Sequence, residues 1–191
     1  MKQRTKRVQA LSKLRLYRMN LLSALLNPVS ESLEDRTAAL IIATNLEHAL
    51  EDAIASFFQG NIEKLRQRLL AGSSQTEGAI SSFYAKSWMA HALGVFGPEI
   101  MDDLTTIIEI RNVFAHSSAN VSFDTPAIAE SCNFNILGRL NWGGLMGPEP
   151  TSPRQKYEKA GSSIGSLIRS ITAPPDDLTD EVVRALKPLL L

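Results

Sequence analysis

The sequence predicts an all-α protein, specifically a compact multi-helix bundle. Apolar residues recur every three or four positions along most of the 191-residue chain, whereas alternating apolar patterns of strand length are nearly absent. Glycine and proline gather at the breaks between the periodic stretches, as expected for loops between helices. With 44% hydrophobic residues the chain can bury one core, so a single globular unit with appendages is expected.

The chain begins with a basic amphipathic segment. Residues 1–18 contain no acid, while aliphatic residues keep roughly helical spacing. This predicts a helix that ends near the Asn27-Pro28 pair, because proline disfavours helix in the residue before it. We expect residues 1–27 to form an arm that packs on the body or on a second copy, or that binds an anionic partner; simple disorder is the third alternative. The candidate nucleic-acid contacts in this arm are Lys2, Arg4, Lys6, Arg7, Lys13, Arg15 and Arg18.

A helical core is expected over residues 32–135. Its longest helix should begin at Ser32, a candidate N-cap, and end at Gly60. One face of this helix is rich in alanine, which predicts close approach of a neighbouring helix and self-association through that face. The other core helices are expected over residues 62–70, from Ser81 or Ser82 to Gly94, over residues 99–115, and from Pro126 as a short helix containing Ile128 and Cys132.

The C-terminal third begins with a stretch rich in glycine and proline. Residues 136–154 are therefore expected to form an exposed loop. Residues 155–191 should then supply two helices that pack on the core, at 155–172 and 177–190.

Composition excludes several classes of function. The net charge is zero, so the molecule as a whole offers nucleic acid no electrostatic attraction. The only cysteine, Cys132, excludes an internal disulfide and a cysteine-cluster metal site. No phosphate-binding glycine motif is present, and His48 and His91 lack a zinc-binding context, so we expect neither a metal nor a cofactor. His91, at a helix end, is expected to pack or cap, and His48 lies among acids. Without a membrane span or an export signal, a cytoplasmic location is expected.

Arg111, Asn112 and His116 stand together where a helix built on aliphatic residues ends. In the structural interpretation, Arg111 faces the buried stripe and pairs with Glu47 or Glu51, while His116 caps carbonyls at the helix end. The residues of this polar network would be Asp35, Arg36, Glu47, Glu51, Arg111 and His116.

The same residues admit a catalytic interpretation. His116 would transfer a proton and Arg111 would stabilise charge on a phosphate during RNA cleavage. On an unbroken helix the two side chains diverge by about 140°, so they share a substrate only if the helix ends near Ala115 or a second subunit completes the site. We favour the structural interpretation and assign no catalytic residue, because no catalytic motif of high specificity is present.

Several blocks together resemble the mannitol operon repressor family in their order and spacing. The resemblance covers residues 34–132 and implies a compact helical protein that represses a sugar-alcohol operon without a recognisable helix-turn-helix. This chain lacks one too, so regulation through a protein partner is expected, with nucleic acid contacted only through the basic arm and a homodimer as one form of association. The blocks are residues 34–43, 46–51, 81–86, 90–94, 110–117 and 122–126.

The block from Arg111 to His116 also resembles, more loosely, the Arg-x4-His signature of HEPN domains. Many HEPN domains are RNA-cleaving toxins that work as dimers. This resemblance implies an alternative function, a ribonuclease that uses Arg111, Asn112 and His116.

Overall fold

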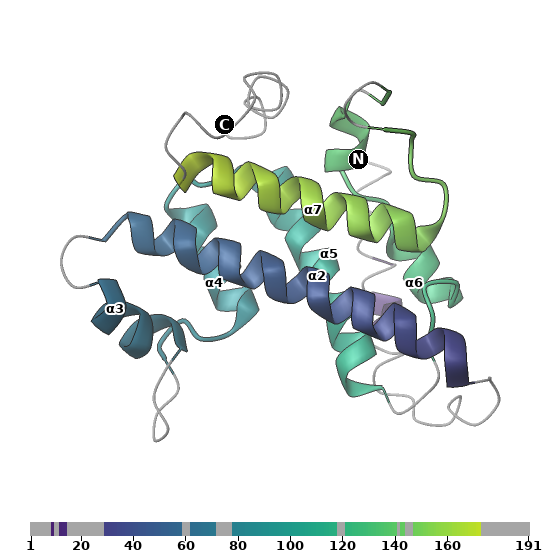
Figure 1. Cartoon of the computed structure of the whole chain (residues 1–191), viewed down its shortest axis with the longest axis horizontal. Helices are drawn as coiled ribbons and strands as arrows, with labels where there is room; N and C mark the ends of the chain where they lie inside the picture. The colour runs from purple at the N-terminus through teal and green to yellow at the C-terminus, as the bar shows by residue number, and fades with distance from the viewer. Residues whose placement is uncertain are drawn as a thin grey trace.

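The computed structural model places the described part of the chain in a packed arrangement of helices (Figure 1). All regular structure in this part is helical and it contains no strand, which confirms the predicted all-α class. The structure describes residues 9, 12–14, 29–58, 62–71, 78–117, 121–140, 142–143 and 147–172.

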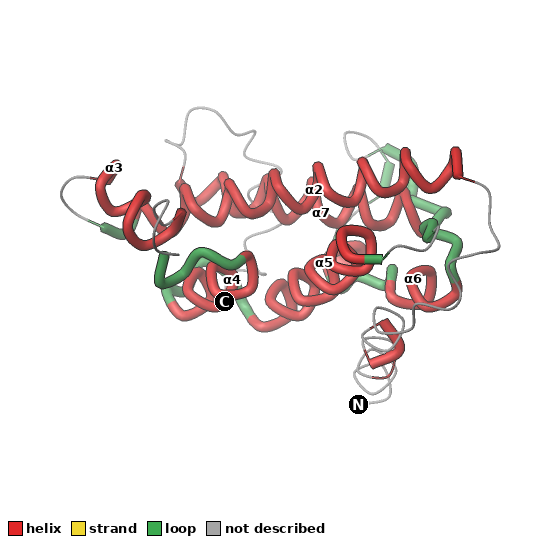
Figure 2. The backbone as a smooth tube through the Cα atoms, turned by 90° about the horizontal axis from the view of Figure 1, so that it is seen from below, coloured by secondary structure: helices red, strands yellow, loops and turns green. Residues whose placement is uncertain are grey.

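The helices form two layers. The helices α2 (Val29–Ser56) and α7 (Pro153–Thr172) lie side by side in one layer. The helices α4 (Phe83–Ala92), α5 (Pro98–His116) and α6 (Pro126–Ser131) lie in the other (Figure 2). Because α2 packs against α7, α5 and α4, the hydrophobic core lies between the layers.

Helix α2 extends beyond the predicted start and stops short of the predicted end. It begins at Val29, so Ser32 lies inside the first turn and the prediction of an N-cap there is wrong. The helix ends at Ser56 instead of Gly60, because the next two amides bond to carbonyls only three positions back and tighten the last turn. The terminus is thus decided by local hydrogen bonds before the glycine is reached.

The small side chains of α2 are used within the chain. Ala39, Ala43 and Ala53 are fully or almost fully buried in the core. A Cβ added to Gly161 of α7 would lie 2.2 Å from Ile42 Cγ2 of α2, so the two helices approach as closely as glycine allows. The prediction of a close neighbouring helix is confirmed. The same face cannot also serve self-association, because it is already covered.

The predicted helix over residues 62–70 is divided into two kinds of turn. The α-helix α3 covers Ile62–Leu65, and a π-helical segment η2 continues over Arg66–Ala71. The wider turn leaves the apolar pattern in place, with Leu70 buried.

Local signals set the ends of α4. The Ser82 hydroxyl accepts a hydrogen bond from the Ala85 amide at 3.1 Å, which confirms the predicted N-cap. At the other end Gly94 adopts a positive φ of 77°, and the Val95 amide bonds to the Ala90 carbonyl at 3.0 Å. This is a Schellman ending, for which glycine is the residue of least steric cost.

Proline begins the next two helices. Pro98 lies in the first turn of α5 and Pro126 in the first turn of α6, where the missing amide hydrogen costs nothing. Helix α5 runs to His116, one residue beyond the predicted end, and its buried face is mainly aliphatic. These two helices agree with the prediction.

The glycine- and proline-rich stretch is more ordered at its start than expected. A 3-10 helix, η3 (Ile136–Arg139), occupies its first residues, with Ile136 buried in the core. Helix α7 then begins at Pro153, two residues before the predicted start. The predicted helix over 177–190 lies outside the described residues.

Little of the basic arm belongs to the described part of the chain. Leu14 is fully buried in the core, and Lys13 Nζ lies 2.8 Å from Glu130 Oε2 on α6. The other candidate nucleic-acid contacts lie outside the described residues: Lys2, Arg4, Lys6, Arg7, Arg15 and Arg18. Among the helices that the structure describes, none has the length and apolar character needed to cross a membrane.

Candidate functional site

The C-terminal end of α5 carries Arg111 and Asn112, followed by His116 in the last turn. Arg111 is half-buried, and its Nη1 donates a hydrogen bond to Asn112 Oδ1 at 3.1 Å. His116 is exposed. The helix is unbroken through His116, and the Ser117 amide still bonds to the Val113 carbonyl at 2.9 Å. Helical geometry therefore directs Arg111 and His116 about 140° apart, and one chain alone does not aim them at one point.

The carboxylates expected to hold Arg111 hold another cation. Lys86 of α4 is buried, and its Nζ lies 2.7 Å from Glu47 Oε1 and donates to Glu51 Oε1 as well. The predicted pairing of Arg111 with Glu47 or Glu51 is therefore wrong. Helix α4 packs directly on the stretch of α2 that carries both acids, so its lysine reaches them.

A sequence signal for Lys86 was present but missed. Lys86 stands three residues after Phe83 and four before Ala90, which are both buried, so it interrupts an apolar stripe. A charge within such a stripe needs a partner of opposite sign, because a buried unpaired ammonium is costly. Two acids one turn apart on α2 supply that partner.

Arg36, and not His116, donates a hydrogen bond to a carbonyl at the end of α5. Arg36 Nη2 donates to the Ser117 carbonyl oxygen at 3.0 Å, which ties α2 to the end of α5. A guanidinium at a helix C-terminus also interacts favourably with the helix dipole. His116 is exposed beside it, so its predicted role as a cap is wrong.

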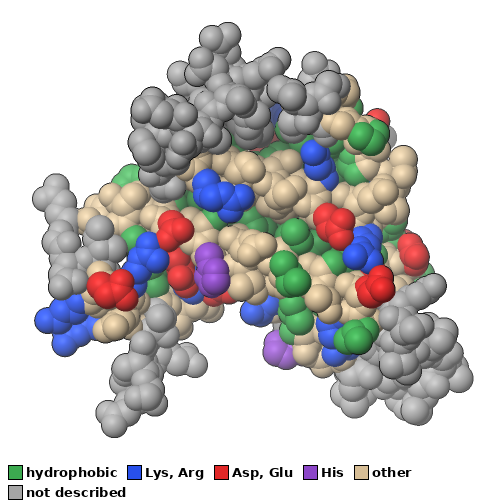
Figure 3. All heavy atoms as spheres, viewed as in Figure 1, with side chains coloured by type: hydrophobic (Ala, Val, Ile, Leu, Met, Phe, Trp, Pro, Cys, Tyr) green, Lys and Arg blue, Asp and Glu red, His purple; other side chains and the backbone are tan. Residues whose placement is uncertain are grey.

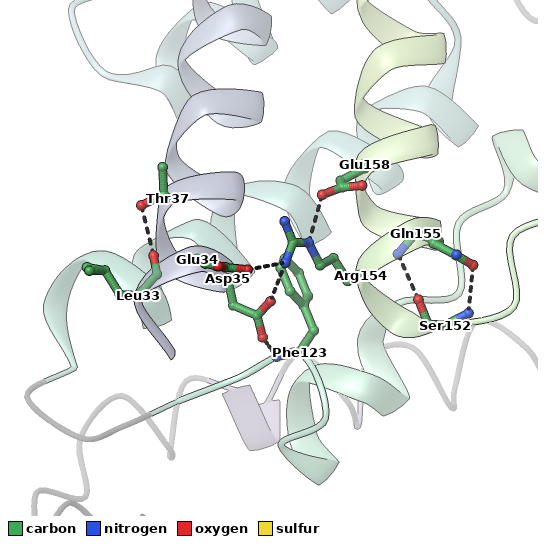
Figure 4. Close-up of polar contacts among 9 residues, drawn as sticks. All are labelled: Leu33, Glu34, Asp35, Thr37, Phe123, Ser152, Arg154, Gln155 and Glu158. Atoms are coloured by element: carbon green, nitrogen blue, oxygen red, sulfur yellow. Dashed lines mark hydrogen bonds and ion pairs between the residues drawn. The ribbon is translucent and has the colours of Figure 1, made fainter. Parts of the chain in front are cut away.

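Asp35 belongs to a separate cluster at the start of α7 (Figure 4). Its Oδ2 accepts from the Phe123 amide at 2.9 Å, and its Oδ1 lies 3.3 Å from Arg154 Nη1. Arg154 Nε also donates to Glu158 Oε1 at 2.9 Å. The pKa of the Arg154 guanidinium is raised, first by this hydrogen bond to Glu158 and further by the charges of Glu158, Asp35 and Glu34. The six residues of the predicted network thus fall into separate clusters.

Asp103 is a structural residue that the sequence analysis missed. It is completely buried on α5, and its carboxylate accepts from the amides of Asn135 and Ile136, both at 2.9 Å. These bonds fix η3 against α5. The available signal was an acid beside Leu104 within the buried aliphatic stripe.

Two buried titratable groups lie in the middle of the core. The Tyr157 hydroxyl donates to the Ala39 carbonyl at 3.1 Å, and burial raises the pKa of this phenol well above its usual range. Burial also raises the pKa of the Cys132 thiol to about 12, against a smaller lowering by Lys156. Both groups are neutral at physiological pH, and Cys132 is a packing residue with no nucleophilic character.

Exposed aromatic side chains line the outer side of α4. Tyr84 and Trp88 are each 48% exposed, and their rings meet edge to face with centroids 6.2 Å apart. The His91 ring lies 5.9 Å from Trp88, and its Nδ1 is 2.8 Å from the Phe96 carbonyl oxygen. The prediction that His91 packs at a helix end is confirmed.

The outer face of α2 and α7 carries a groove of about 880 Å³. Its floor includes Leu33, Ile41 and Ile42 of α2, and Arg154 and Glu158 of α7 lie along its other side. Figure 3 shows hydrophobic side chains on this face flanked by acidic and basic ones. Neither this groove nor the smaller hollow beside it contains Arg111 or His116.

Buried polar groups in the described part of the chain are satisfied by the protein itself. Each buried side-chain nitrogen or oxygen there has a hydrogen-bond partner. No group of three or more histidine, cysteine, aspartate or glutamate side chains within the described ranges could hold a metal ion. The buried polar and charged side chains of the described residues therefore serve contacts between the packed helices.

No family model matches the chain, and comparison with curated proteins and with solved structures finds no match either.

Proposed function

We propose that this protein is a non-enzymatic regulator that acts by binding another protein in the cytoplasm. The observation that carries the proposal is the exposed Tyr84–Trp88 pair on α4. Tyrosine and tryptophan dominate the binding energy of protein interfaces, because they bury a large area at small entropic cost. The buried charged groups make structural contacts instead: Lys86 pairs with Glu47, and Asp103 accepts a hydrogen bond from the Asn135 amide.

The resemblance of residues 34–132 to the mannitol operon repressor family supports transcription as the process being regulated. Since the sequence has no helix-turn-helix, contact with a second protein is the simpler route to an operon. A tagged chain that captures a regulator or polymerase component from the native cell would support this assignment, and unchanged operon expression in a deletion strain would contradict it.

The contact surface is tested with matched variants. Trp88→Ala should lose the partner that the wild-type chain captures, with a loss of at least tenfold in recovered partner, the effect of about 1.4 kcal/mol. Phe57→Ala is the control, because Phe57 is a similarly exposed aromatic residue, 46% accessible, in the turn that follows α2. Capture that survives Trp88→Ala, or that is lost equally in both variants, contradicts a contact at α4.

A HEPN-like ribonuclease is the alternative function. The observation that favours it is that Arg111 forms no ion pair with a carboxylate in the part of the chain that the structure describes: it is half-buried, donates to Asn112, and stands five residues before an exposed His116. Because the two side chains diverge on one helix, this function requires a second copy to complete the site.

Purified protein incubated with structured and unstructured RNA distinguishes the two functions. Ribonuclease activity should fall by at least a hundredfold in His116→Ala and in Arg111→Ala. In this function His116 transfers the proton and Arg111 stabilises the charge on the phosphate. His48→Ala, which removes another exposed histidine, should keep full activity. Absence of cleavage, or cleavage that survives His116→Ala, rejects the alternative.

A further inference from the structure

A small polar hollow lies between α2 and α7, toward the C-terminal ends of both helices. Its volume is about 250 Å³, and residues three and four positions apart on each helix form its two sides. The polar side chains and the glycine of these rows are Asn45, His48 and Asp52 on α2 and Ser162, Gly165 and Arg169 on α7. A concave site with a few converging polar groups is typical of a site for a small polar molecule.

The two helices run parallel, and their contacts fix which residues lie level with one another (Figure 1). The Tyr157 hydroxyl bonds to the Ala39 carbonyl, an offset of 118 positions along the chain. Because both helices rise equally per residue, the same offset places Gly165 between Asn45 and His48 of α2. The glycine therefore leaves a gap in α7 at the level of two polar side chains of α2.

The guanidinium of Arg169 lies over this gap. A Cβ placed on Gly165 would be 3.3 Å from Arg169 Nη2 and 3.4 Å from its Nη1. The arginine side chain thus folds back along its own helix and takes the space that a side chain at position 165 would use. A guanidinium has five N–H donors on a planar fork, so it can hold an anion in addition to its other contacts.

The acids near the hollow are paired with cations. Asp52 lines the hollow, and its Oδ1 lies 2.5 Å from Arg66 Nη2 of η2. Two further acids on the adjacent part of α2 are held by Lys86. With these carboxylates paired, the charge of Arg169 favours an anion in the hollow.

A phosphate group matches these donors in charge and in number. Its oxygens accept several hydrogen bonds at once, and a guanidinium binds two of them in parallel. The Asn45 amide and the Ser162 hydroxyl add neutral donors. The volume limits the ligand to a small one, since pockets for drug-sized molecules measure about 300–1,000 Å³.

We propose that this hollow binds a phosphate group, free or carried by a small molecule, between Arg169 and Asn45 at the gap that Gly165 leaves. Ser162 and His48 lie at the border of the bound group. The proposal concerns the outer face of α2 and α7, and it does not rest on a partner at α4 or on the end of α5.

Titration of the full-length protein with inorganic phosphate and with glycerol phosphate tests the proposal. Calorimetry should give saturable binding of at least one probe with a Kd of about 1 mM or tighter. The bound probe should also shift the NMR resonances of the His48 imidazole, one of the three in the chain. Tighter binding of glycerol phosphate identifies a phosphorylated small molecule as the ligand, whereas equal or tighter binding of inorganic phosphate identifies free phosphate; both support the site.

Substitutions locate the binding. Arg169→Gln should weaken it at least tenfold, because the charged donors are lost while an amide remains. Arg139→Gln is the matched control, since Arg139 is an exposed arginine on η3 that pairs with Glu99, and it should bind like the wild type. Gly165→Ala should weaken binding at least threefold by displacing the guanidinium, without lowering the free energy of unfolding.

Three outcomes overturn the proposal. The first is that neither probe saturates the protein. The second is an equal loss of affinity in Arg169→Gln and Arg139→Gln, which shows that the probe responds to surface charge in general. The third is saturable binding that leaves the His48 resonances unmoved, which places the anion elsewhere on the chain.

Discussion

Lys86 places an ammonium group inside the core, and Glu47 and Glu51 on α2 provide its two carboxylate partners. The lysine side chain is only 4% exposed, while the two acids keep about one fifth of their surface in water. The arrangement joins α4 to α2 and gives the ammonium a hydrogen bond to each of the two carboxylates. Removing the cation leaves two adjacent carboxylates repelling each other at the edge of the core.

We predict that Lys86→Ala lowers the free energy of unfolding by about 3 kcal/mol, measured by urea denaturation. Lys13→Ala is the matched control, because Lys13 and Glu130 form an exposed pair and exposed pairs contribute less than about 1 kcal/mol. If both variants lose a similar amount of unfolding free energy, the buried ion pair of Lys86 is no more stabilising than the exposed pair of Lys13.

Cys132 should resist alkylation in the folded protein. Its thiol is buried with a pKa raised to about 12, so the reactive thiolate is scarce at pH 8. Mass spectrometry should find the native chain unmodified by iodoacetamide and the urea-unfolded chain fully modified. Equal rates of modification would contradict the burial of this residue.

The same raised pKa predicts a loss of stability at alkaline pH. The folded state holds the thiol proton more tightly than the unfolded chain, whose thiol pKa is near 9.0. The free energy of unfolding contributed by this group therefore falls as pH rises from about 9 toward 12. Cys132→Ala should make the decline between pH 8 and pH 10.5 shallower in urea titrations, and an unchanged slope would contradict the assignment.

At the scale of helices, α7 approaches α2 closely where Gly161 faces Ile42. The added methyl group of an alanine would meet Ile42 Cγ2, which lies next to the backbone on a β-branched side chain and cannot swing away. Gly165, one turn later, faces only the end of the Arg169 side chain at 3.3 Å. The two glycines therefore have different roles in the same helix.

We predict that Gly161→Ala lowers the free energy of unfolding by about 1–2 kcal/mol, since overpacking outweighs the better helix propensity of alanine. Gly165→Ala should be neutral or stabilising by up to about 1 kcal/mol, because the guanidinium can move. Thermal unfolding followed by circular dichroism measures both variants. A stabilised Gly161→Ala would show that α2 and α7 can separate without cost.

For the whole molecule, α2 is the element shared by both layers. It packs against α7 within its own layer and against α4 and α5 of the other, and the buried residues form one hydrophobic cluster. A helix held from several sides cannot unfold while its neighbours remain in place. The described part of the chain should therefore behave as one cooperative unit.

The two tryptophans allow a test of this cooperativity. Trp88 lies on α4 and Trp142 follows η3, where Lys159 Nζ lies 5.9 Å from its ring. We predict that Trp88→Phe and Trp142→Phe, each leaving one fluorescent reporter, give urea midpoints equal to that of circular dichroism measured on the same variant. A separate midpoint for either reporter would divide the chain into two units.

Much of the helical order could be predicted from the sequence because helix ends depend on nearby residues. Ser82, Gly94, Pro98 and Pro126 act within one or two turns of where they stand, and each marks a helix end in the structure. The start of α2 was mistaken, because no glycine or proline between Val29 and Ser32 stops the helix from extending.

Local spacing determined the helices and their apolar faces, since their hydrogen bonds and caps join residues a few positions apart. The polar contacts were decided only by the tertiary structure. Lys86 meets Glu47 from 39 residues away, and Arg36 meets Ser117 from 81 residues away. The sequence shows that a buried charge needs a partner, but which partner it finds depends on how the helices pack, because only packing brings distant side chains within hydrogen-bond distance.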